Sequence, residues 1–255
     1  MGNRLAGRVA LVSGSTRGIG RTIAEVFAAE GAQVAVTGRT VDRGQKVVDR
    51  IREAGGEAEF FTLDITDEDN VRDVIAAVVD RFGGLSTLIN NAAPTATVAS
   101  TVKPLFQYTT QEWNEIITGA LTGNVFWASK YAWPHLVEAP GATIVNISSG
   151  QSTKGYSGFG AYAAAKGAMN SLTRTLAVEG APHGIRCNAI IVGRVVSGRG
   201  DSGVGLTKDR IGGIGNPGQI ASTALFLASD ESSFINGDLI TADGGVSMDG
   251  DVHMG

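Results

Sequence analysis

The sequence has little cysteine, little net charge and no long apolar segment. Cys187 is the only cysteine among 255 residues, so no intrachain disulfide can form. The formal net charge is −4, whereas binding to nucleic acid needs a basic surface, so we expect no nucleic-acid partner. No apolar stretch reaches the roughly 18 residues of a membrane span, and the N-terminal residues lack the apolar run of a signal peptide. We therefore expect a cytoplasmic protein that does not bind membranes.

The composition is otherwise that of a folded protein. Hydrophobic residues make up 43% and charged residues 18%, which supplies a sizeable core and argues against a disordered chain. Glycine is frequent, with 36 residues, and this indicates many tight turns or close backbone approaches. We expect no metal ion among the cofactors.

Short apolar runs alternate with longer amphipathic segments along the whole chain. Seven of the runs predict strands, at residues 8–13, 33–37, 57–63, 87–90, 142–148, 184–191 and 238–242. The longer segments predict helices at residues 18–30, 41–54, 67–82, 111–138 (with a bend near Pro134), 161–180 and 218–229. Repeated strand–helix units make parallel strands with helices on both faces. We therefore predict one doubly wound α/β domain over residues 1–255, with a mainly parallel sheet of about seven strands.

Two segments interrupt this rhythm. Residues 94–110 are long and partly apolar, and residues 197–216 are rich in glycine and carry several charges. Long loops in compact domains are commonly binding segments, so we predict that both lie on the substrate side. The alternative is that they are plain surface connections.

A glycine-rich turn joins the first predicted strand to the first predicted helix. In a doubly wound fold this is the place where a helix N-terminus and backbone amides bind a pyrophosphate. The glycine spacing, Gly-x3-Gly-x-Gly, is weak evidence alone, and the strand before it and the helix after it strengthen it. The residues predicted to bind the cofactor here are Gly14, Ser15, Arg17, Gly18, Ile19 and Gly20.

The end of the second predicted strand indicates which dinucleotide binds. NAD-binding proteins tend to carry an acidic residue there, which accepts a hydrogen bond from the ribose 2′-hydroxyl. This chain has Gly38 followed by Arg39, and a guanidinium suits a 2′-phosphate. Arg17 is placed to reach the same phosphate. The sequence therefore favours NADP(H) over NAD(H), the alternative being that both arginines are merely solvated.

Tyr162 and Lys166 are spaced to share one face of a helix, about one turn apart. An ammonium beside a phenol stabilises the phenolate and lowers the tyrosine pKa from about 10. Tyr162 is then suited to act as general acid in carbonyl reduction or as general base in alcohol oxidation. Upstream, Ser148 and Ser149 end a predicted strand at the same edge as the glycine turn. Either hydroxyl is placed to donate to a substrate carbonyl or to cap a turn.

In their order and spacing these segments resemble the classical short-chain dehydrogenases/reductases over nearly the whole chain, which implies a Rossmann-type fold. The matching segments are residues 13–20, 90–93, Ser149, Tyr162 with Lys166, and 243–245. In that family a catalytic serine stands 13 residues before the tyrosine, which selects Ser149 over Ser148.

The resemblance also implies roles for residues that no local pattern identifies. Lys166, besides its catalytic role, would bind the nicotinamide ribose. Tyr162 would also contact the cofactor, beside the same ribose. Asn91 would lie beside the adenosine half, and Asp64 with Ile65 would contact the adenine. After the sixth predicted strand, Val195 would bond the nicotinamide carboxamide through its backbone, and Ser197 would keep a hydroxyl that the family has there.

The chain departs from the family in the fourth predicted helix. The family carries an asparagine there that helps hold a water linking the lysine to solvent. Here Ala120 stands at that position, and Asn124 follows with one extra residue in the run. Either Asn124 points along the same face and partly substitutes as a catalytic residue, or backbone carbonyls and water carry the relay alone. A helix bulge of one residue would accommodate the insertion.

The function implied is hydride transfer between NADP(H) and a ketone or secondary alcohol, with Tyr162 as general acid/base. Apolar residues in 94–108 and 156–159 favour an apolar small-molecule substrate, although they are equally suited to packing. One alternative is a 3-oxoacyl thioester reductase. Its phosphopantetheine carrier would need a basic surface at the entrance of the site, and the residues that would supply one are Arg194, Arg199, Lys208 and Arg210. Another is a non-catalytic NADP(H)-binding regulatory protein.

We expect a homo-oligomer, a tetramer or a dimer. Members of the family usually form such oligomers, and the small residues 163–165 and 167–168 suit close helix packing at an interface between subunits.

Overall fold

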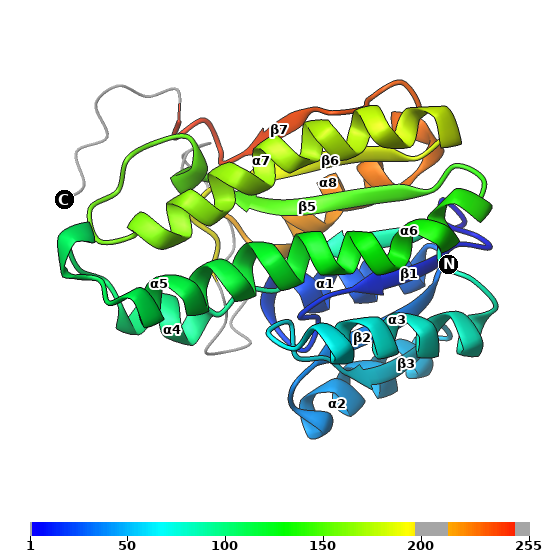
Figure 1. Ribbon diagram of the computed structural model, residues 1–255. Coiled ribbons are helices and arrows are strands. Elements are labelled where there is room, and N and C mark those ends of the chain that lie inside the picture. Colours follow the sequence, from blue (N-terminus) through cyan, green and yellow to red (C-terminus); the bar gives the residue numbers. More distant parts are fainter. Residues whose placement is uncertain (1, 197–213, 248–255) are drawn as a thin grey trace.

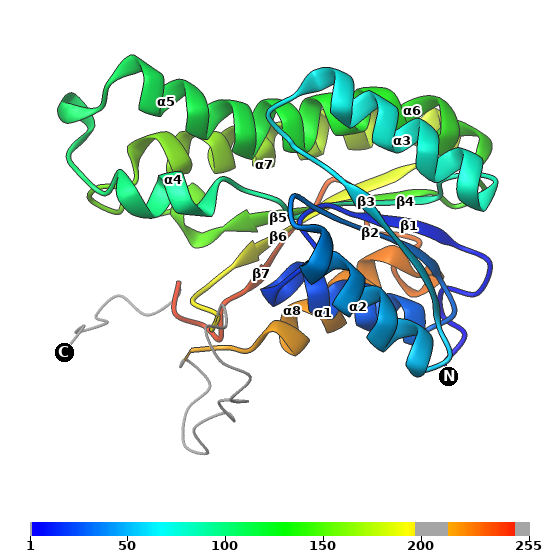
Figure 2. The ribbon, with the colours of Figure 1, turned by 90° about the horizontal axis from the view of Figure 1, so that it is seen from below.

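The computed structural model describes residues 2–196 and 214–247, and these build one parallel sheet between two layers of helices (Figures 1 and 2). The sheet has seven strands in the order β3-β2-β1-β4-β5-β6-β7, and every neighbouring pair is parallel. The strands are β1 (Val9–Val12), β2 (Gln33–Gly38), β3 (Glu57–Thr62), β4 (Thr87–Asn90), β5 (Thr143–Ser149), β6 (Arg186–Val192) and β7 (Leu239–Ala242). This arrangement confirms the predicted doubly wound α/β fold.

Helices cover both faces of the sheet, as Figure 2 shows. On one face lie α1 (Gly18–Ala29), α2 (Val41–Glu53) and α8 (Pro217–Ala228), and on the other lie α3 (Glu68–Phe82), α6 (Ala128–Glu138) and α7 (Gly160–Gly180). Two apolar clusters fill the two layers, one on each side of the sheet. Because both faces are covered, β1 and β4 are buried at every residue, which is why they appear in the sequence as continuous apolar runs.

The strand order reverses between β1 and β4. The chain builds β1, β2 and β3 toward one edge, then returns to place β4 on the other side of β1. In such sheets a crevice forms at the carboxyl ends of the strands at this switch point, and ligands bind there. The glycine turn follows β1 at this position, and the residues after β4 lie beside it.

The predicted helix over residues 111–138 is not a single α-helix. It consists of α5 (Thr110–Ile117), a π-helical segment η2 (Thr118–Trp127) and α6, which stays helical through Pro134. The N–H of Ala128 donates to the carbonyl of Gly123, five residues earlier. The extra residue in this run is thus absorbed by ten residues of wider helix rather than by a bulge of one residue.

The predicted loop over residues 94–110 contains helical structure. It holds the short helix α4 (Thr95–Ser100) and a turn of 3₁₀-helix, η1 (Leu105–Gln107). Of the second predicted loop, 197–216, only residues 214–216 lie among the described residues. The remaining short 3₁₀ turns are η3 (Gly150–Ser152), η4 (Ala181–His183) and η5 (Asp230–Ser232). Within the described part of the chain no helix is both long and apolar enough to cross a membrane.

Candidate active site

The glycine turn is built by close backbone approach. Gly14 and Gly18 have φ values of 65° and 54°, in the left-handed region that favours glycine. A Cβ on Gly20 would lie 2.4 Å from Asn91 Nδ2 and 2.5 Å from the Gly14 carbonyl oxygen. The Ser15 hydroxyl donates to the Val12 carbonyl at 2.8 Å and accepts from the Thr37 N–H at 2.8 Å. The turn therefore holds the N-terminus of α1 against the ends of β1, β2 and β4.

Ser13 ties the end of β1 to the end of β4. Its Oγ accepts from the N–H groups of Asn91 and Ala92 at 2.8 and 2.9 Å. In return, the Asn91 side-chain amide donates to the Ser13 carbonyl at 2.8 Å. The predicted cofactor residue Asn91 is thus fixed beside the glycine turn, at the switch point of the sheet.

Two exposed arginines flank this turn. Arg17 donates to the Thr95 hydroxyl at 2.8 Å, and Arg39 follows β2. Partial burial opposes ionisation of Asp64, but hydrogen bonds from Thr66 and the positive charge of Arg39 outweigh it and hold the pKa of Asp64 below its usual value. The predicted adenine contact Asp64 and the predicted phosphate contact Arg39 are therefore close enough to interact electrostatically.

The predicted catalytic residues meet at the end of β5. A side-chain hydrogen bond joins Ser149 to Tyr162 near the start of α7. Lys166 is only 1% exposed, and its Nζ donates to the Ile147 carbonyl at 2.7 Å. The same Nζ lies 5.6 Å from the centre of the Tyr162 ring. The structure thus brings all three residues together at the edge of the sheet that carries the glycine turn.

Burial governs the protonation of this group. It raises the pKa of Tyr162 to about 12, and the hydrogen bond with Ser149 opposes only part of the rise. Burial also lowers the pKa of Lys166 to about 7. This corrects the expectation that the lysine lowers the tyrosine pKa, because loss of solvation outweighs any stabilisation of the phenolate. The Tyr162 phenol is therefore protonated at neutral pH.

A further asparagine, which sequence reasoning missed, supports Ser149. The Ser148 hydroxyl donates to Asn170 Oδ1 at 2.7 Å, and Asn170 Nδ2 donates to the Ser152 hydroxyl at 2.8 Å. Ser152 in turn donates to the Ser149 carbonyl at 2.6 Å. Asn170 stands four residues after Lys166, so the helical spacing of Tyr162, Lys166 and Asn170 was the signal that could have identified it.

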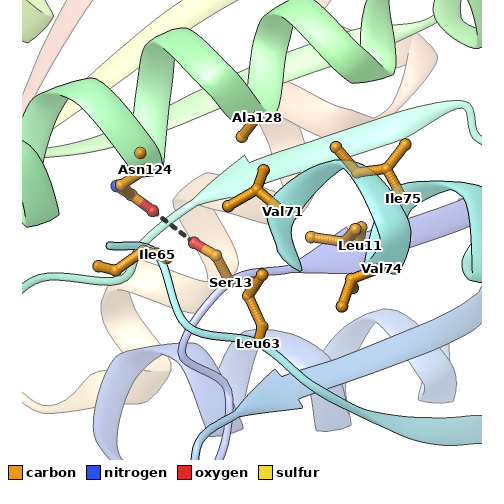
Figure 3. Close-up of a pocket in the computed structure, with 10 residues that line it drawn as sticks. Leu11, Ser13, Leu63, Ile65, Val71, Val74, Ile75, Asn124 and Ala128 are labelled. Atoms are coloured by element: carbon orange, nitrogen blue, oxygen red, sulfur yellow. Dashed lines mark hydrogen bonds between the residues drawn. The ribbon is translucent and has the colours of Figure 1, made fainter. Parts of the chain in front are cut away.

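Asn124 bonds to the residue that follows β1. Its side chain is fully buried, and its Oδ1 accepts from the Ser13 hydroxyl at 2.7 Å (Figure 3). Lys166 donates to a backbone carbonyl instead, so the geometry favours the second of the two relay alternatives. Ala120 is fully buried as well. A catalytic role for Asn124 stays a prediction.

The segment after β6 continues as a short parallel bridge. Val195 pairs with Gly215, and the Val196 N–H donates to the Gly215 carbonyl at 3.0 Å. Val195 is thereby held next to the end of β6, the strand that pairs with β5. The predicted cofactor residue Ser197 lies outside the described residues, as do Arg199, Lys208 and Arg210.

The two predicted apolar segments lie together over the start of α7. The Tyr108 hydroxyl donates to the Gly158 carbonyl at 2.9 Å. A Cβ on Gly160 would lie 2.8 Å from the Leu105 side chain. Phe106 is 86% exposed and Tyr156 is 44% exposed, so these segments carry exposed apolar side chains near the start of α7. No cluster of residues suited to a metal ion occurs in the described ranges.

Known proteins share both the sequence and the fold. The family described as enoyl-(acyl carrier protein) reductase matches residues 14–247. A 2,5-dichloro-2,5-cyclohexadiene-1,4-diol dehydrogenase of Sphingobium indicum is 36% identical, over 97% of this chain and 99% of that protein. A 3-oxoacyl-[acyl-carrier-protein] reductase of Thermotoga maritima is 31% identical, over 95% and 99% respectively. The crystal structure of a candidate short-chain alcohol dehydrogenase from Sinorhizobium meliloti superimposes with a TM-score of 0.84 at 33% identity, covering 96% of this chain and 98% of that one.

Proposed function

The chain belongs to the short-chain dehydrogenase/reductase family of oxidoreductases, and we propose that it transfers a hydride between NADP(H) and a ketone or secondary alcohol, with Tyr162 as general acid/base. The observation that carries this proposal is the meeting of Ser149, Tyr162 and Lys166 beside the glycine turn. Relatives named as dehydrogenases and reductases support an enzyme that acts on alcohol or carbonyl groups.

The residues present fit a nicotinamide dinucleotide. A Cβ on Gly14 would lie 3.0 Å from Ala92 Cα, so the turn leaves backbone rather than side chains facing the crevice. Gly14, Ser15, Gly18, Ile19 and Gly20 would hold the pyrophosphate at the start of α1. Asp64, Ile65 and Asn91 would hold the adenosine, and Tyr162, Lys166, Val195 and Ser197 the nicotinamide riboside. When bound, the nicotinamide supplies or accepts the hydride.

The protein's own residues manage the proton. Ser149 donates a hydrogen bond to the carbonyl oxygen, and Tyr162 gives that oxygen its phenolic proton in reduction. Because the pKa of Tyr162 is about 12, the phenol is protonated at neutral pH and is ready to act as the acid. Lys166, held by the Ile147 carbonyl, lies beside Tyr162, and in its protonated form it lowers the energy of the phenolate that forms. Alcohol oxidation runs these steps in reverse.

NADP(H) is favoured over NAD(H) by the end of β2. Gly38 occupies the position that usually carries the acid of an NAD site, and a Cβ there would lie 2.7 Å from Thr16 Cγ2, so a side chain would require Thr16 to shift. Arg39 and Arg17 are both exposed at this turn, where two guanidinium groups suit a 2′-phosphate.

The substrate is an apolar ketone or alcohol, because Leu105, Phe106 and Tyr156 expose apolar surface around the start of α7, the helix that carries Tyr162. A relative named for a chlorinated cyclohexadiene diol favours a cyclic substrate. The second candidate is a 3-oxoacyl thioester reductase, which the Thermotoga maritima relative favours. Intact Ser149, Tyr162 and Lys166 argue against a non-catalytic regulatory protein.

We further propose that the protein is cytoplasmic and forms a homo-oligomer, a tetramer or a dimer. Light scattering would measure the mass of this oligomer.

The test is oxidation of NADPH and NADH by the purified protein with cyclic, aromatic and steroidal ketones and with 3-oxoacyl thioesters. Turnover of a cyclic ketone, faster with NADPH, is expected. Turnover of thioesters alone would replace the first candidate by the second. Arg39→Asp should shift the preference toward NADH, and an unchanged ratio of NADPH to NADH turnover would remove the case for NADP(H).

A further inference from the structure

We propose that Asn124 is a positioning residue for the adenosine half of the cofactor, acting through Ser13 rather than through Lys166. This inference rests on the proposed binding of NADP(H). Asn124 belongs to η2, the π-helical segment that accommodates the extra residue of this chain. Its side chain reaches the end of β1 from the face of the sheet that carries α3, α6 and α7 (Figure 3).

The hydrogen bonds around Ser13 leave one role for Asn124. A hydroxyl has two acceptor lone pairs and one proton. The N–H groups of Asn91 and Ala92 use both lone pairs. The proton has two acceptors within reach, Asn124 Oδ1 at 2.7 Å and the Ile89 carbonyl at 3.1 Å. The shorter bond goes to Asn124, which therefore sets the orientation of the hydroxyl that fixes Asn91 beside the adenosine site.

Gly123, the neighbour of Asn124, contacts a second part of the same site. A Cβ on Gly123 would lie only 1.6 Å from the Ile65 carbonyl oxygen, so backbone meets backbone here. Two adjacent residues of η2 thus contact the segments that follow β1, β3 and, through Ser13, β4. All three segments carry residues predicted to bind the cofactor. The wider π turn sets which side chain faces β1, and so it brings Asn124 to Ser13.

Asn124 is a poor choice for stability alone. Its Nδ2 is buried and has no hydrogen-bond partner within residues 2–196 and 214–247. A buried donor without an acceptor destabilises the fold. Beside it lies a cavity lined by apolar side chains, among them Leu11, Leu63 and Val74 (Figure 3). A leucine at position 124 would place its methyl groups against these side chains, so it should fold at least as stably as the asparagine.

This contrast supplies the test. For Asn124→Leu we expect the dissociation constants of NADPH and of adenosine 2′,5′-bisphosphate to rise about three- to tenfold, the range of one neutral hydrogen bond. The melting temperature should stay the same or rise, and the KM for the ketone and the pH dependence of kcat should not change. In Ser13→Ala the further substitution of Asn124 should have little added effect on NADPH binding, because the two residues act through one bond.

Ser129→Ala is the matched control. Ser129 is buried on α6 and its hydroxyl also has no partner among the described residues, but it lies outside the cofactor site. Its NADPH affinity should equal that of the wild type. Unchanged affinity in both Asn124→Leu and Asn124→Ala would overturn the inference. A shifted pH profile of kcat with unchanged affinity would overturn it in favour of the relay role. Failure of the wild type to bind NADPH or NADH would instead overturn the proposed function and this inference with it.

Discussion

Two regions at the same edge of the sheet are organised in different ways. One, named the catalytic edge for its proposed role, comprises Ser148, Ser149, Ser152, Tyr162, Lys166 and Asn170. The other, named the cofactor edge for its proposed role, comprises residues 13–20, Asn91, Ala92 and Asn124. At the catalytic edge, side chains bond one another, and Asn170 uses both its oxygen and its nitrogen. At the cofactor edge, backbone groups make most of the bonds, and among the described residues Asn124 bonds through its oxygen alone.

The two edges thus depend on different parts of the chain, side chains at one and backbone at the other. Proton transfer needs particular side-chain groups in fixed positions, so the catalytic edge depends on side-chain chemistry. Binding of a phosphate needs room for backbone amides to approach, so the cofactor edge depends on the absence of side chains. Substitutions at the catalytic edge should therefore lower kcat, and added atoms at the cofactor edge should weaken NADPH binding.

The largest effect is expected from Tyr162→Phe. It removes the proton donor while keeping the ring, so kcat for the ketone should fall about 10²- to 10⁴-fold, the contribution of general acid catalysis. The dissociation constant of NADPH, measured by fluorescence titration, should change little. Ketone reduction that survives this substitution would contradict the role given to Tyr162. Loss of NADPH binding together with the activity would show that catalysis and cofactor binding do not depend on separate edges.

A pH-dependent change in stability is expected from Lys166. Burial lowers the pKa of Lys166 from 10.5 to about 7, so above pH 10.5 the lysine is neutral in both states and burial brings no penalty. As the pH falls from 10.5 to 7, only the unfolded chain gains the proton, and the folded state loses stability. The free energy of unfolding of Lys166→Met, relative to that of the wild type, should therefore increase by at most about 1.4 kcal/mol for each unit by which the pH is lowered in this window. Urea unfolding without cofactor at pH 7.5 and 9.5 measures this, and an equal difference at both pH values would contradict the lowered pKa.

Gly20→Ala tests the cofactor edge. The added methyl would collide with Asn91 Nδ2 and the Gly14 carbonyl, at 2.4 and 2.5 Å. Overpacking of this kind costs about 1–3 kcal/mol. Because its relief displaces the Gly14 backbone and Asn91 from the positions proposed to hold the cofactor, we expect NADPH affinity to fall by up to the equivalent of that energy, about 5- to 150-fold, while kcat at saturating NADPH is largely kept. Gly84→Ala is the control, because nothing lies within 4 Å of a Cβ there. Equal binding by both variants would show that the turn tolerates side chains.

The smallest of these effects is expected from Ser152→Ala. It removes the bond to the Ser149 carbonyl and leaves Asn170 Nδ2 without its acceptor. Displacement of Ser149 should lower kcat about three- to tenfold, in proportion to one hydrogen bond, with the KM for NADPH unchanged. Ser152→Thr keeps the hydroxyl and should restore most of the rate. A loss of NADPH affinity as large as the loss of kcat would show that the two edges are coupled.

Local patterns in the sequence predicted much of this protein. All seven strands occur within two residues of the predicted positions, since buried parallel strands form continuous apolar runs. The glycine turn was predictable because its spacing follows from tight backbone geometry next to a helix start. The pairing of Tyr162 with Lys166 was predictable from the helical repeat, and family resemblance selected Ser149. Each of these depends on residues close in sequence or on a spacing that the family shares.

The long-range contacts and the pKa values of the buried groups follow from the tertiary structure instead. The ten residues of π-helix in η2, the bond from Asn124 to Ser13 and the contact of Gly123 with Ile65 join segments far apart in the chain. The pKa of Tyr162 rises because burial removes its water, and burial is a property of the assembled layers. The sequence by itself thus determined which chemical groups are present and on which elements they lie. Packing decided which of them touch, because contacts and solvation depend on the whole fold.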